Sequence, residues 1–392
     1  MTDDTRASTH RRSGGIPLDT VVATPSGWVE AADLRAGSAV FNERGRISYL
    51  SRDPIIVRDR PTMRVSFSDG SGVVADAHQL WISHTYKARH HGHDPKVVTT
   101  EEMAASLRYG TASSRRPFNH AIQRPQPLQY PRQAHLVDPY VLGVWLGDGS
   151  KHNGTVTTAS WDAEDLASLV EARGYPTKTV HNGVAGGNGR LVKMYGDFQR
   201  NARALGLLLN KHVPESYLRG DVQQRLDLLC GLMDSDGSSA NGRCEFYNTN
   251  RSLIDGVAEL VRSLGCHGRV SEKASYPDRL LPQGHKPRSL QRSWRVSFSP
   301  TFTPFKLPRK IAAFHRPRRQ RGAAPGPVLG PRQWRTVTSV AVEATRDIVR
   351  VEIETDPHLL MVGRELVTML DSTPRARSLV RASERTAARL AA

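Results

Sequence analysis

Short stretches of alternating apolar and polar residues dominate the first 84 positions of the chain. Apolar runs of four or five residues are separated by turn dipeptides such as Pro25-Ser26 and Asp69-Gly70. Alternation with a period of two, bounded by Gly, Pro, Asp and Ser, is typical of β-strands. Residues 15–84 are therefore predicted to form an all-β unit.

A different composition follows, rich in His, Arg and Pro. Between residues 85 and 135 only the patch at 101–107 has a helical pattern, so we expect a connecting or DNA-contacting arm. His90, His91 and His93 cluster here. A metal site and a solvated polar loop both remain open for them.

Helices and strands alternate from 136 to 316, and the segment is close to an internal duplication. One helix is predicted to start after Asp138, with proline at its first position, and to run to Asp148. A second starts after Asp221, which forms a capping-box pattern with Gln224, and runs to Asp236. The halves are expected at about 136–218 and 219–316.

The two helices share one register when their glycines are aligned. Leu142–Gly149 and Cys230–Gly237 each have glycine second and Asp-Gly last. Glycine inside a helix costs about 1 kcal/mol relative to alanine, so Gly143 and Gly231 indicate close contact between two backbones. We expect Gly149 and Gly237, which follow the helices, to be left-handed C-caps.

Strand patterns return after a linker at 317–334. Residues 336–343 and 348–353 are rich in Val, Ile and Thr, so residues 335–372 are predicted to be a second all-β part. A polar, basic and disordered lead is expected at 1–14, and a basic helical tail at 373–392. The fold class that follows is a multidomain protein in which an α+β module interrupts an all-β one.

Composition and charge limit the classes of partner that the chain is expected to bind. The chain has 392 residues, enough for two or three domains, and a formal charge of +17, which favours double-stranded DNA or another polyanion. It has no apolar run near the roughly 20 residues that cross a bilayer and no secretory signal at its start, so we expect a cytoplasmic protein with no membrane partner. The three cysteines, Cys230, Cys244 and Cys266, match neither a disulfide framework nor a zinc site.

Packing through the two glycines would bring Asp148 and Asp236 together. Adjacent carboxylates repel unless a cation lies between them, and the negative ends of two helix dipoles favour a cation at the same place. Oxygen ligands beside a phosphate suit Mg²⁺ (or Mn²⁺), which activates water for phosphodiester hydrolysis.

These paired motifs resemble the two signature helices of the monomeric LAGLIDADG (DOD-type) homing endonucleases. The resemblance covers roughly residues 136–314 and implies a site-specific double-strand DNA endonuclease, monomeric, with internal pseudo-twofold symmetry. It implies that Asp148 and Asp236 are catalytic and bind the divalent metals. Asp234 aligns with Leu146 of the first motif, so no metal is assigned to it.

The same family places a basic residue near the site in each half and reads DNA with strands. The resemblance implies catalytic roles for Lys211 and Lys310, with Lys193 and Lys273 as competing candidates. Arginines of the second half's strand region are DNA-binding candidates, without a choice between base and phosphate contacts. They are Arg243, Arg269, Arg292 and Arg295, with Arg279 and Arg288 beside them.

The outer β segments resemble the Hint fold of inteins, the self-splicing protein elements. Gly15 stands where an intein has its Cys or Ser nucleophile, so the first acyl shift has no side chain to start it. His78 and His358 match two intein histidines, and Asp371-Ser372 replaces the usual Asn followed by Cys, Ser or Thr. We expect splicing to be lost and these five residues to be vestigial.

Two alternative functions remain open. The chain is either a protein-splicing intein element, opposed by Gly15, Leu370 and Asp371, or a non-cleaving nucleic-acid-binding relic or maturase. Both would leave the paired aspartates without a catalytic task.

Overall fold

The computed structural model describes residues 14–110, 116–183, 187–273, 292–316, 334–356 and 358–372. The predicted lead, most of the linker, the tail and the candidates Arg279 and Arg288 lie outside these residues. The chain divides into two compact units, one drawn from Met1–Gln129 and Arg332–Ala392 and the other from Tyr130–Pro331. Each unit has its own buried apolar cluster. Within the described residues, no helix has the length and apolar character needed to cross a membrane.

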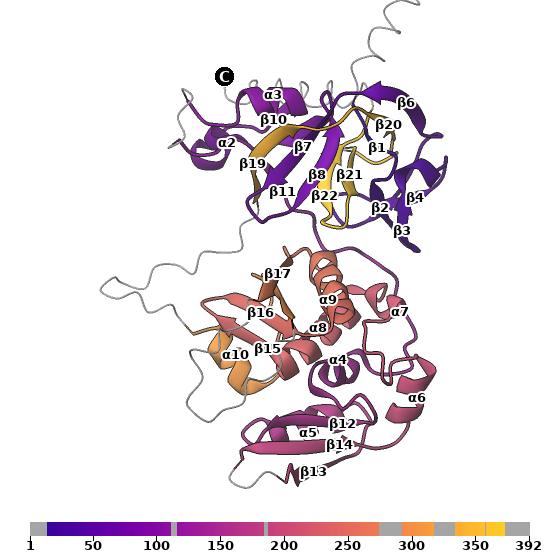
Figure 1. The fold of residues 1–392 in the computed structure, drawn as a ribbon, viewed down its shortest axis with the longest axis vertical. Coiled ribbons are helices and arrows are strands. Elements are labelled where there is room, and N and C mark those ends of the chain that lie inside the picture. Colours follow the sequence, from indigo (N-terminus) through magenta and orange to yellow (C-terminus); the bar gives the residue numbers. More distant parts are fainter. Residues whose placement is uncertain are drawn as a thin grey trace, which may run out of the picture. The chain divides into compact units, whose positions relative to one another are not determined.

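Unit 1 is built mainly of β-sheets (Figure 1). Its short helical elements are η1 (Ala31–Asp33), α2 (Tyr86–His91) and α3 (Thr100–Ala105). Its strands are β1 (Ile16–Pro17), β2 (Val21–Thr24), β3 (Gly27–Glu30), β4 (Ala39–Phe41), β5 (Ile47–Tyr49), β6 (Ile55–Arg60), β7 (Thr62–Phe67), β8 (Gly72–Asp76), β9 (Leu80–Ser83), β10 (Lys96–Thr99), β11 (Ala121–Gln123), β19 (Trp334–Val342), β20 (Arg346–Arg350), β21 (Leu359–Val362) and β22 (Val367–Leu370).

The two sequence stretches of unit 1 share their sheets. The orders are β11-β19-β7-β8, β22-β21-β2-β3 and β1-β20-β6, with two-stranded β10-β9 and β4-β5. All the pairs are antiparallel, and the bond between β1 and β20 sets Ile16 opposite Val349. Strands from both ends of the chain therefore close one core, in which Trp81 is fully buried.

The segment predicted as a connecting arm is partly folded into unit 1. Helix α3 lies at the helical patch, but α2, β10 and β11 had not been predicted there. Strand β10 pairs with β9, the strand that precedes it, whereas β11 pairs with β19 from near the other end of the chain. Local periodicity does not report such pairing, because a strand at the edge of a sheet needs little alternation of its own.

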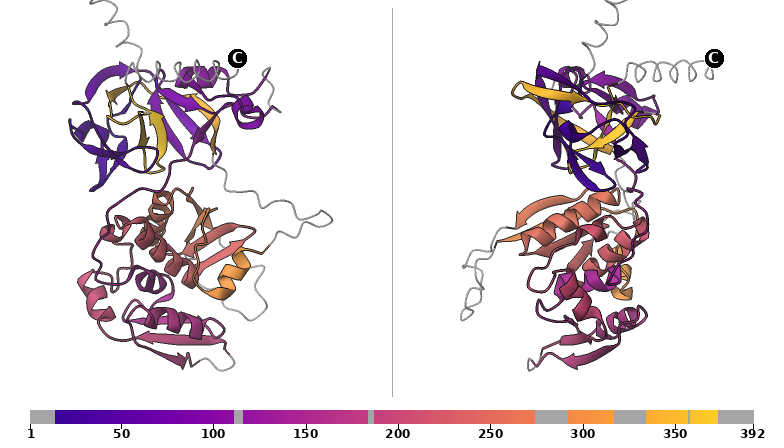
Figure 2. Two further views of the ribbon diagram at one scale, coloured as in Figure 1. Left: turned by 180° about the vertical axis from the view of Figure 1, so that it is seen from behind. Right: turned by 90° about the vertical axis from the view of Figure 1, so that its right-hand side faces the viewer.

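Unit 2 combines helices with two antiparallel sheets. The sheet orders are β12-β14-β13 and β15-β16-β18-β17, and α4 and α8 lie between the sheets (Figure 2). Its elements are α4 (Pro139–Asp148), β12 (Thr155–Ala159), α5 (Ala163–Glu171), β13 (Thr177–His181), β14 (Gly189–Met194), α6 (Phe198–Ala204), α7 (Glu215–Leu218), α8 (Val222–Asp236), β15 (Gly237–Ala240), β16 (Arg243–Asn248), α9 (Arg251–Ser263), β17 (Arg269–Lys273), β18 (Ser293–Phe298) and α10 (Pro308–Phe314).

Unit 2 repeats one arrangement of elements. The first half runs from the long helix α4 through strand β12, helix α5, strands β13 and β14 and the short helix α6. The second half runs from α8 in the same order, except that two strands, β15 and β16, precede its second helix α9. In each sheet the last strand lies between two earlier ones, β14 between β12 and β13 and β18 between β16 and β17. The residue after the long helix also pairs in the same way in both halves. Gly149 bridges Val156, and Gly237 pairs with Phe246. With unit 1 included, the chain is a mostly-β protein of several sheets.

The predicted starts of α4 and α8 are confirmed. The Asp138 carboxylate accepts hydrogen bonds from the amides of Tyr140 and Val141, at 2.9 and 3.2 Å. Asp221 and Gln224 form a reciprocal capping box. Each cap satisfies amides that the first helical turn leaves without partners.

The prediction for the helix ends is wrong. Gly149 and Gly237 are extended, with φ of −75° and −92°, rather than left-handed, because the chain passes directly into strand pairing. Glycine is required there for space. A Cβ would lie 2.3 Å from the Trp145 carbonyl oxygen at Gly149 and 2.7 Å from the Met233 carbonyl oxygen at Gly237.

Candidate active site

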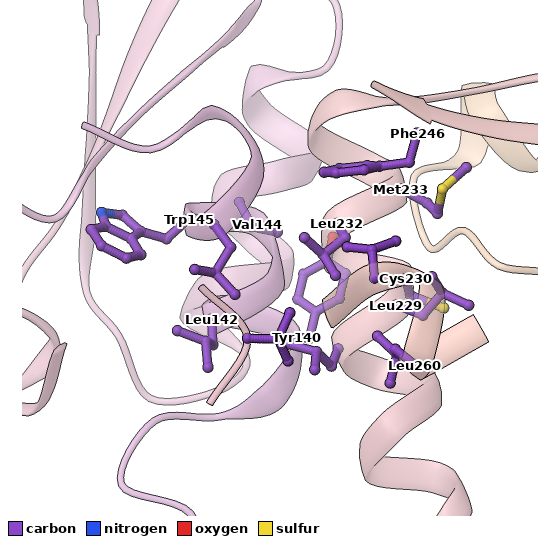
Figure 3. Close-up of a cluster of buried hydrophobic side chains, with 14 of the residues drawn as sticks. Tyr140, Leu142, Val144, Trp145, Leu229, Cys230, Leu232, Met233, Phe246 and Leu260 are labelled. Carbon is purple, nitrogen blue, oxygen red and sulfur yellow. The ribbon is translucent and has the colours of Figure 1, made fainter. Parts of the chain in front are cut away.

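The long helices α4 and α8 meet through a pair of glycines. A Cβ built on Gly143 would lie 2.2 Å from the carbonyl oxygen of Leu228, and one on Gly231 would lie 2.1 Å from that of Tyr140. Backbone of each helix thus occupies the space where the other would carry a side chain. Side chains of both helices, among them Tyr140 and Leu232, fill the surrounding core (Figure 3).

This contact brings the two helix ends together. A Cβ on Gly147 would lie 3.3 Å from the Cβ of Asp236, so the final turns also touch. Burial, and then the charge of Asp236, raise the pKa of Asp148 to about 6. Burial also raises the pKa of Asp236, against the lowering effects of Asn248, Lys310 and Lys211. Two half-buried acids therefore share one site at the negative ends of two helices.

A lysine lies against the end of each helix. The Lys211 ammonium donates to the carbonyl oxygens of Trp145 at 2.7 Å, Leu146 at 3.2 Å and Gly149 at 2.5 Å. Burial lowers its pKa to about 8, although both acids oppose this. The ammonium caps α4 and brings a positive charge toward the acids.

Lys310 has the same relation to α8. Its ammonium donates to the carbonyl oxygens of Met233 at 2.8 Å, Ser235 at 3.2 Å and Gly237 at 2.9 Å. Burial lowers its pKa. An ammonium has three N–H donors, and three carbonyls surround each lysine, so both side chains are held at the helix ends.

Of the competing lysines, Lys193 is exposed on β14, where it pairs in register with Thr155 and Lys178. Lys273 ends β17, and its side chain is outside the described part of the structure.

Asp234, the extra acid of the second motif, is engaged elsewhere. Its buried carboxylate accepts from the Tyr140 hydroxyl at 2.9 Å and from the amides of Lys306 at 2.9 Å and Leu307 at 3.2 Å. These bonds join α8 to the start of α10, the helix that carries Lys310. Asp234 therefore has a structural role, because it holds the start of α10 against α8.

The donor set fits a hard divalent cation. Asp148 and Asp236 supply carboxylate oxygens at the ends of α4 and α8. Within the described residues, no cluster of three or more His, Cys, Asp or Glu side chains could enclose a metal ion. Mg²⁺ is commonly held by one or two carboxylates and completes its shell with water and phosphate oxygens. Two acids whose pKa values are raised also gain free energy when a cation joins them.

Sequence reasoning missed two asparagines beside the site. The Asn248 amide nitrogen lies 3.3 Å from Asp236 Oδ2, and the Asn250 amide nitrogen lies 2.5 Å from the Lys211 carbonyl oxygen. Asn250 also caps α9 by accepting from the Leu253 amide. The only sequence signal was an Asn-x-Asn turn between strand and helix. That signal does not show that Asn248 lies beside Asp236.

Three of the arginine candidates, Arg243, Arg269 and Arg295, lie on the polar face of the second sheet, and Arg292 directly precedes β18. Arg243 and Arg295 share Glu245, with Arg295 at 3.1 Å and Arg243 at 3.7 Å. Arg269 is exposed on β17, and Arg292 lies 3.7 Å from Glu272. The opposite face carries buried apolar residues, among them Phe246 and Val296.

Residues compared with an intein junction meet in unit 1. The Ser372 hydroxyl donates to the Gly14 carbonyl oxygen at 2.9 Å, and the Gly15 carbonyl accepts from the Asp76 amide. A small cavity adjoins them, lined in part by Gly15, Gln79 and Ser372.

Both intein-like histidines lie beside acids in unit 1. His358 Nδ1 lies 3.0 Å from Asp371 Oδ2. The His78 ring contacts Arg60 at 3.2 Å and Asp76 at 3.5 Å.

Comparison with known proteins agrees with the sequence resemblance. Residues 223–286, which include the second motif helix, match the family model of the LAGLIDADG-like domain. The chain is 31% identical over 381 residues to the replicative DNA helicase DnaB of Mycobacterium intracellulare. This match covers 91% of the chain and 58% of the DnaB protein.

Solved structures of two kinds are similar to parts of the chain. Variants of the homing endonuclease I-DmoI match 45% of this chain and 95% of theirs, at 15% identity and a TM-score of 0.31. The MchDnaB-1 intein matches 27% of this chain and 72% of its own, at 25% identity and a TM-score of 0.20. Residues 223–286 therefore resemble a LAGLIDADG-like domain, as the second motif had indicated.

Proposed function

We propose that unit 2 is a divalent-metal-dependent endonuclease that cuts both strands of DNA at a specific site. The observation that carries the proposal is the pairing of Asp148 and Asp236 at the ends of two helices packed through Gly143 and Gly231. A structural role alone does not account for two partly buried acids with raised pKa values, in which the charge of Asp236 adds to the effect of burial on Asp148.

Asp148 and Asp236 would hold the metal through carboxylate oxygens. A bound Mg²⁺ or Mn²⁺ supplies an activated water and offsets charge on the scissile phosphate. Lys211 and Lys310 place positive charge beside the acids while their N–H groups hold the last carbonyls of α4 and α8. We assign these lysines to keeping both helix ends, and thus both acids, in place near an anionic substrate.

DNA would lie against the polar faces of the two sheets of unit 2. Arg243, Arg269, Arg292 and Arg295 supply positive charge in the second half, and Lys178 and Lys193 supply it in the first. The formal charge of +17 over the whole chain favours the same partner. Because one chain supplies both halves, a monomer with pseudo-twofold symmetry suffices to reach both strands.

Unit 1 we assign to a Hint-like domain whose two parts, residues 15–84 and 335–372, flank the endonuclease domain at 136–316. Splicing that starts at Gly15 is lost in this proposal, because glycine has no side-chain nucleophile.

A second candidate function, residual acyl transfer, is favoured by the contact of the Ser372 hydroxyl with the Gly14 carbonyl. Attack by Ser372 Oγ on the Gly14 carbonyl carbon would form an ester, break the Gly14–Gly15 bond and leave the proton on the Gly15 nitrogen. The shift alone keeps residues 1–14 attached through the ester, so the purified chain is treated with hydroxylamine, which cleaves esters. Release of residues 1–14 by the parent and not by Ser372→Ala would support this candidate. A chain that keeps residues 1–14 after the treatment would exclude it.

The endonuclease proposal is tested by incubating the full chain and Mg²⁺ with a plasmid library of randomised inserts and sequencing the cut ends. We expect a narrow set of related sites, cut in both strands. Binding without cutting at any Mg²⁺ or Mn²⁺ concentration would instead support a non-cleaving relic or maturase.

A further inference from the structure

The two acids of the candidate active site are not equivalent in their surroundings. Asp236 receives a hydrogen bond from the side chain of Asn248, at 3.3 Å. Within the described residues, no side-chain donor reaches the Asp148 carboxylate. One acid of an otherwise repeated site is therefore held by an amide and the other is not.

The register of the sheets identifies the residue that stands in the place of Asn248 in the first half. Gly149 bridges Val156, and Gly237 pairs with Phe246. Two residues further along, the corresponding positions are Thr158 and Asn248. Thr158 has the shorter side chain, and its place opposite Arg190 on β14 matches that of Asn248 opposite Trp294 on β18.

The Asn248 amide is itself oriented. Its Oδ1 accepts a hydrogen bond from the Asn250 backbone amide at 2.9 Å, which requires that Nδ2 be the end facing Asp236. Asn250 then donates from its own side chain to the Lys211 carbonyl oxygen at 2.5 Å. Lys211 belongs to the first half, and its ammonium holds the end of α4, which carries Asp148.

A continuous relay thus connects the two acids across the pseudo-twofold axis: Asp236, Asn248, Asn250, Lys211 and the last turn of α4. The first half has a comparable latch to the second, because Asp162 before α5 holds Arg309 with bonds of 2.9 and 2.6 Å. Among the described residues, no hydrogen bond joins Asp162 or Arg309 to Asp148. The relay through Asn248 is specific to one side.

We propose that Asn248 and Asn250 are positioning residues that orient Asp236 for the metal and fix its spacing from Asp148. The inference rests on the proposed endonuclease function. A ligand that is held by a neighbouring hydrogen bond binds a metal more tightly, and loss of such a neighbour typically weakens affinity by about 10–100-fold. Removal of Asn248 therefore weakens metal binding at Asp236 more than at Asp148. At limiting metal the chain then cuts one DNA strand and leaves nicked DNA.

The test compares Asn248→Ala with Thr158→Ala, the matched position of the other half, in the full chain. Mn²⁺ binding to the metal-free protein is followed by electron paramagnetic resonance of the free ion, and products are followed on a supercoiled plasmid carrying a selected site. We expect Asn248→Ala to bind Mn²⁺ roughly tenfold more weakly. It should accumulate nicked circles that excess Mn²⁺ converts to linear DNA, while Thr158→Ala matches the parent in both measurements.

Asn250→Asp tests the relay separately. It keeps the acceptor that caps α9 but loses the donor to the Lys211 carbonyl, so we expect nicked circles to accumulate while the thermal midpoint stays close to that of the parent.

Parent-like Mn²⁺ affinity and product ratio in both Asn248→Ala and Asn250→Asp would overturn the inference. The inference would also be overturned if Asn248→Ala lost as much DNA affinity without metal as it lost Mn²⁺ affinity. Asn248 would then act on the DNA itself. If the parent chain cuts no DNA, the proposed function fails, whereas the Mn²⁺ measurement still decides whether Asn248 orients Asp236.

Discussion

Gly143 and Gly231 face each other so closely that a Cβ added to either would lie within 3.1 Å of the other's Cα. Their contact sets the separation of α4 and α8 along the whole seam, including the final turns. The candidate active site depends on this absence of side chains, because Asp148 and Asp236 stand five residues beyond the glycines on each helix.

Either Gly143→Ala or Gly231→Ala should destabilise unit 2. Alanine gains about 1 kcal/mol of helix propensity, but the new methyl group meets backbone that cannot rotate away. We expect a net loss of about 1–3 kcal/mol in the free energy of unfolding, measured with urea. Gln223→Ala, at an exposed position of α8, should change it by less than about 0.5 kcal/mol. Equal midpoints for all three variants would contradict tight packing at the seam.

Asp148→Asn should stabilise the metal-free protein at neutral pH. The pKa of Asp148 rises from 3.8 to about 6 on folding, so the folded state binds the proton more tightly than the unfolded state. Its contribution to stability is complete below about pH 4 and is lost as pH rises through 6, at a cost of up to about 3 kcal/mol. Thermal unfolding at pH 5 and pH 8 measures this. A variant that is less stable than the parent at pH 8 would contradict the assigned burial.

Lys211→Met should lower cleavage without weakening DNA binding. The substitution removes the charge and leaves the carbonyls of Trp145 and Gly149 without their donor, so the end of α4 loosens. We expect at least a tenfold fall in kcat, a stability loss of about 1–3 kcal/mol and partial recovery of kcat in Lys211→Arg. Similar kcat for the parent and Lys211→Met would remove Lys211 from the site.

DNA binding should weaken steeply with salt. Phosphate contacts by lysine and arginine release counterions, so the logarithm of the association constant falls linearly with that of the salt concentration. Arg269→Ala should reduce the slope by about one if this exposed side chain contacts a phosphate. Fluorescence anisotropy with a selected duplex and Ca²⁺ measures both slopes. Binding that does not change with salt would argue against an interface that contacts the DNA phosphates.

Short-range signals made the central helices predictable. Asp138 and Asp221 act as caps within three residues of themselves, and the glycine register of the two motifs showed that the helices are paired. The sequence also led to both lysines, through the resemblance to a known family. Their contacts with the helix ends required coordinates, because Lys211 lies 62 residues from Gly149, whose carbonyl it meets.

The parts that were missed depend on partners outside their own segments. Strands β10 and β11 exist because β9 and β19 pair with them, and Asn248 is a functional candidate only because β16 carries it to the end of α8. The helix-cap geometry of Gly149 and Gly237 was mispredicted for a related reason. The pattern Asp-Gly after a helix indicates a glycine, but it does not distinguish a left-handed turn from an extended residue with no room for a Cβ.

The most direct test of the account is cleavage of a selected DNA site by Asp148→Asn and Asp236→Asn beside the parent chain, with Mg²⁺ and with EDTA. We predict that the parent cuts both strands only with Mg²⁺, and that neither variant forms linear product although both bind the duplex within about threefold of the parent, because no charge on the DNA-facing sheets has changed. Double-strand cutting by both variants at the parental rate would contradict the central claim that these two acids hold the metal.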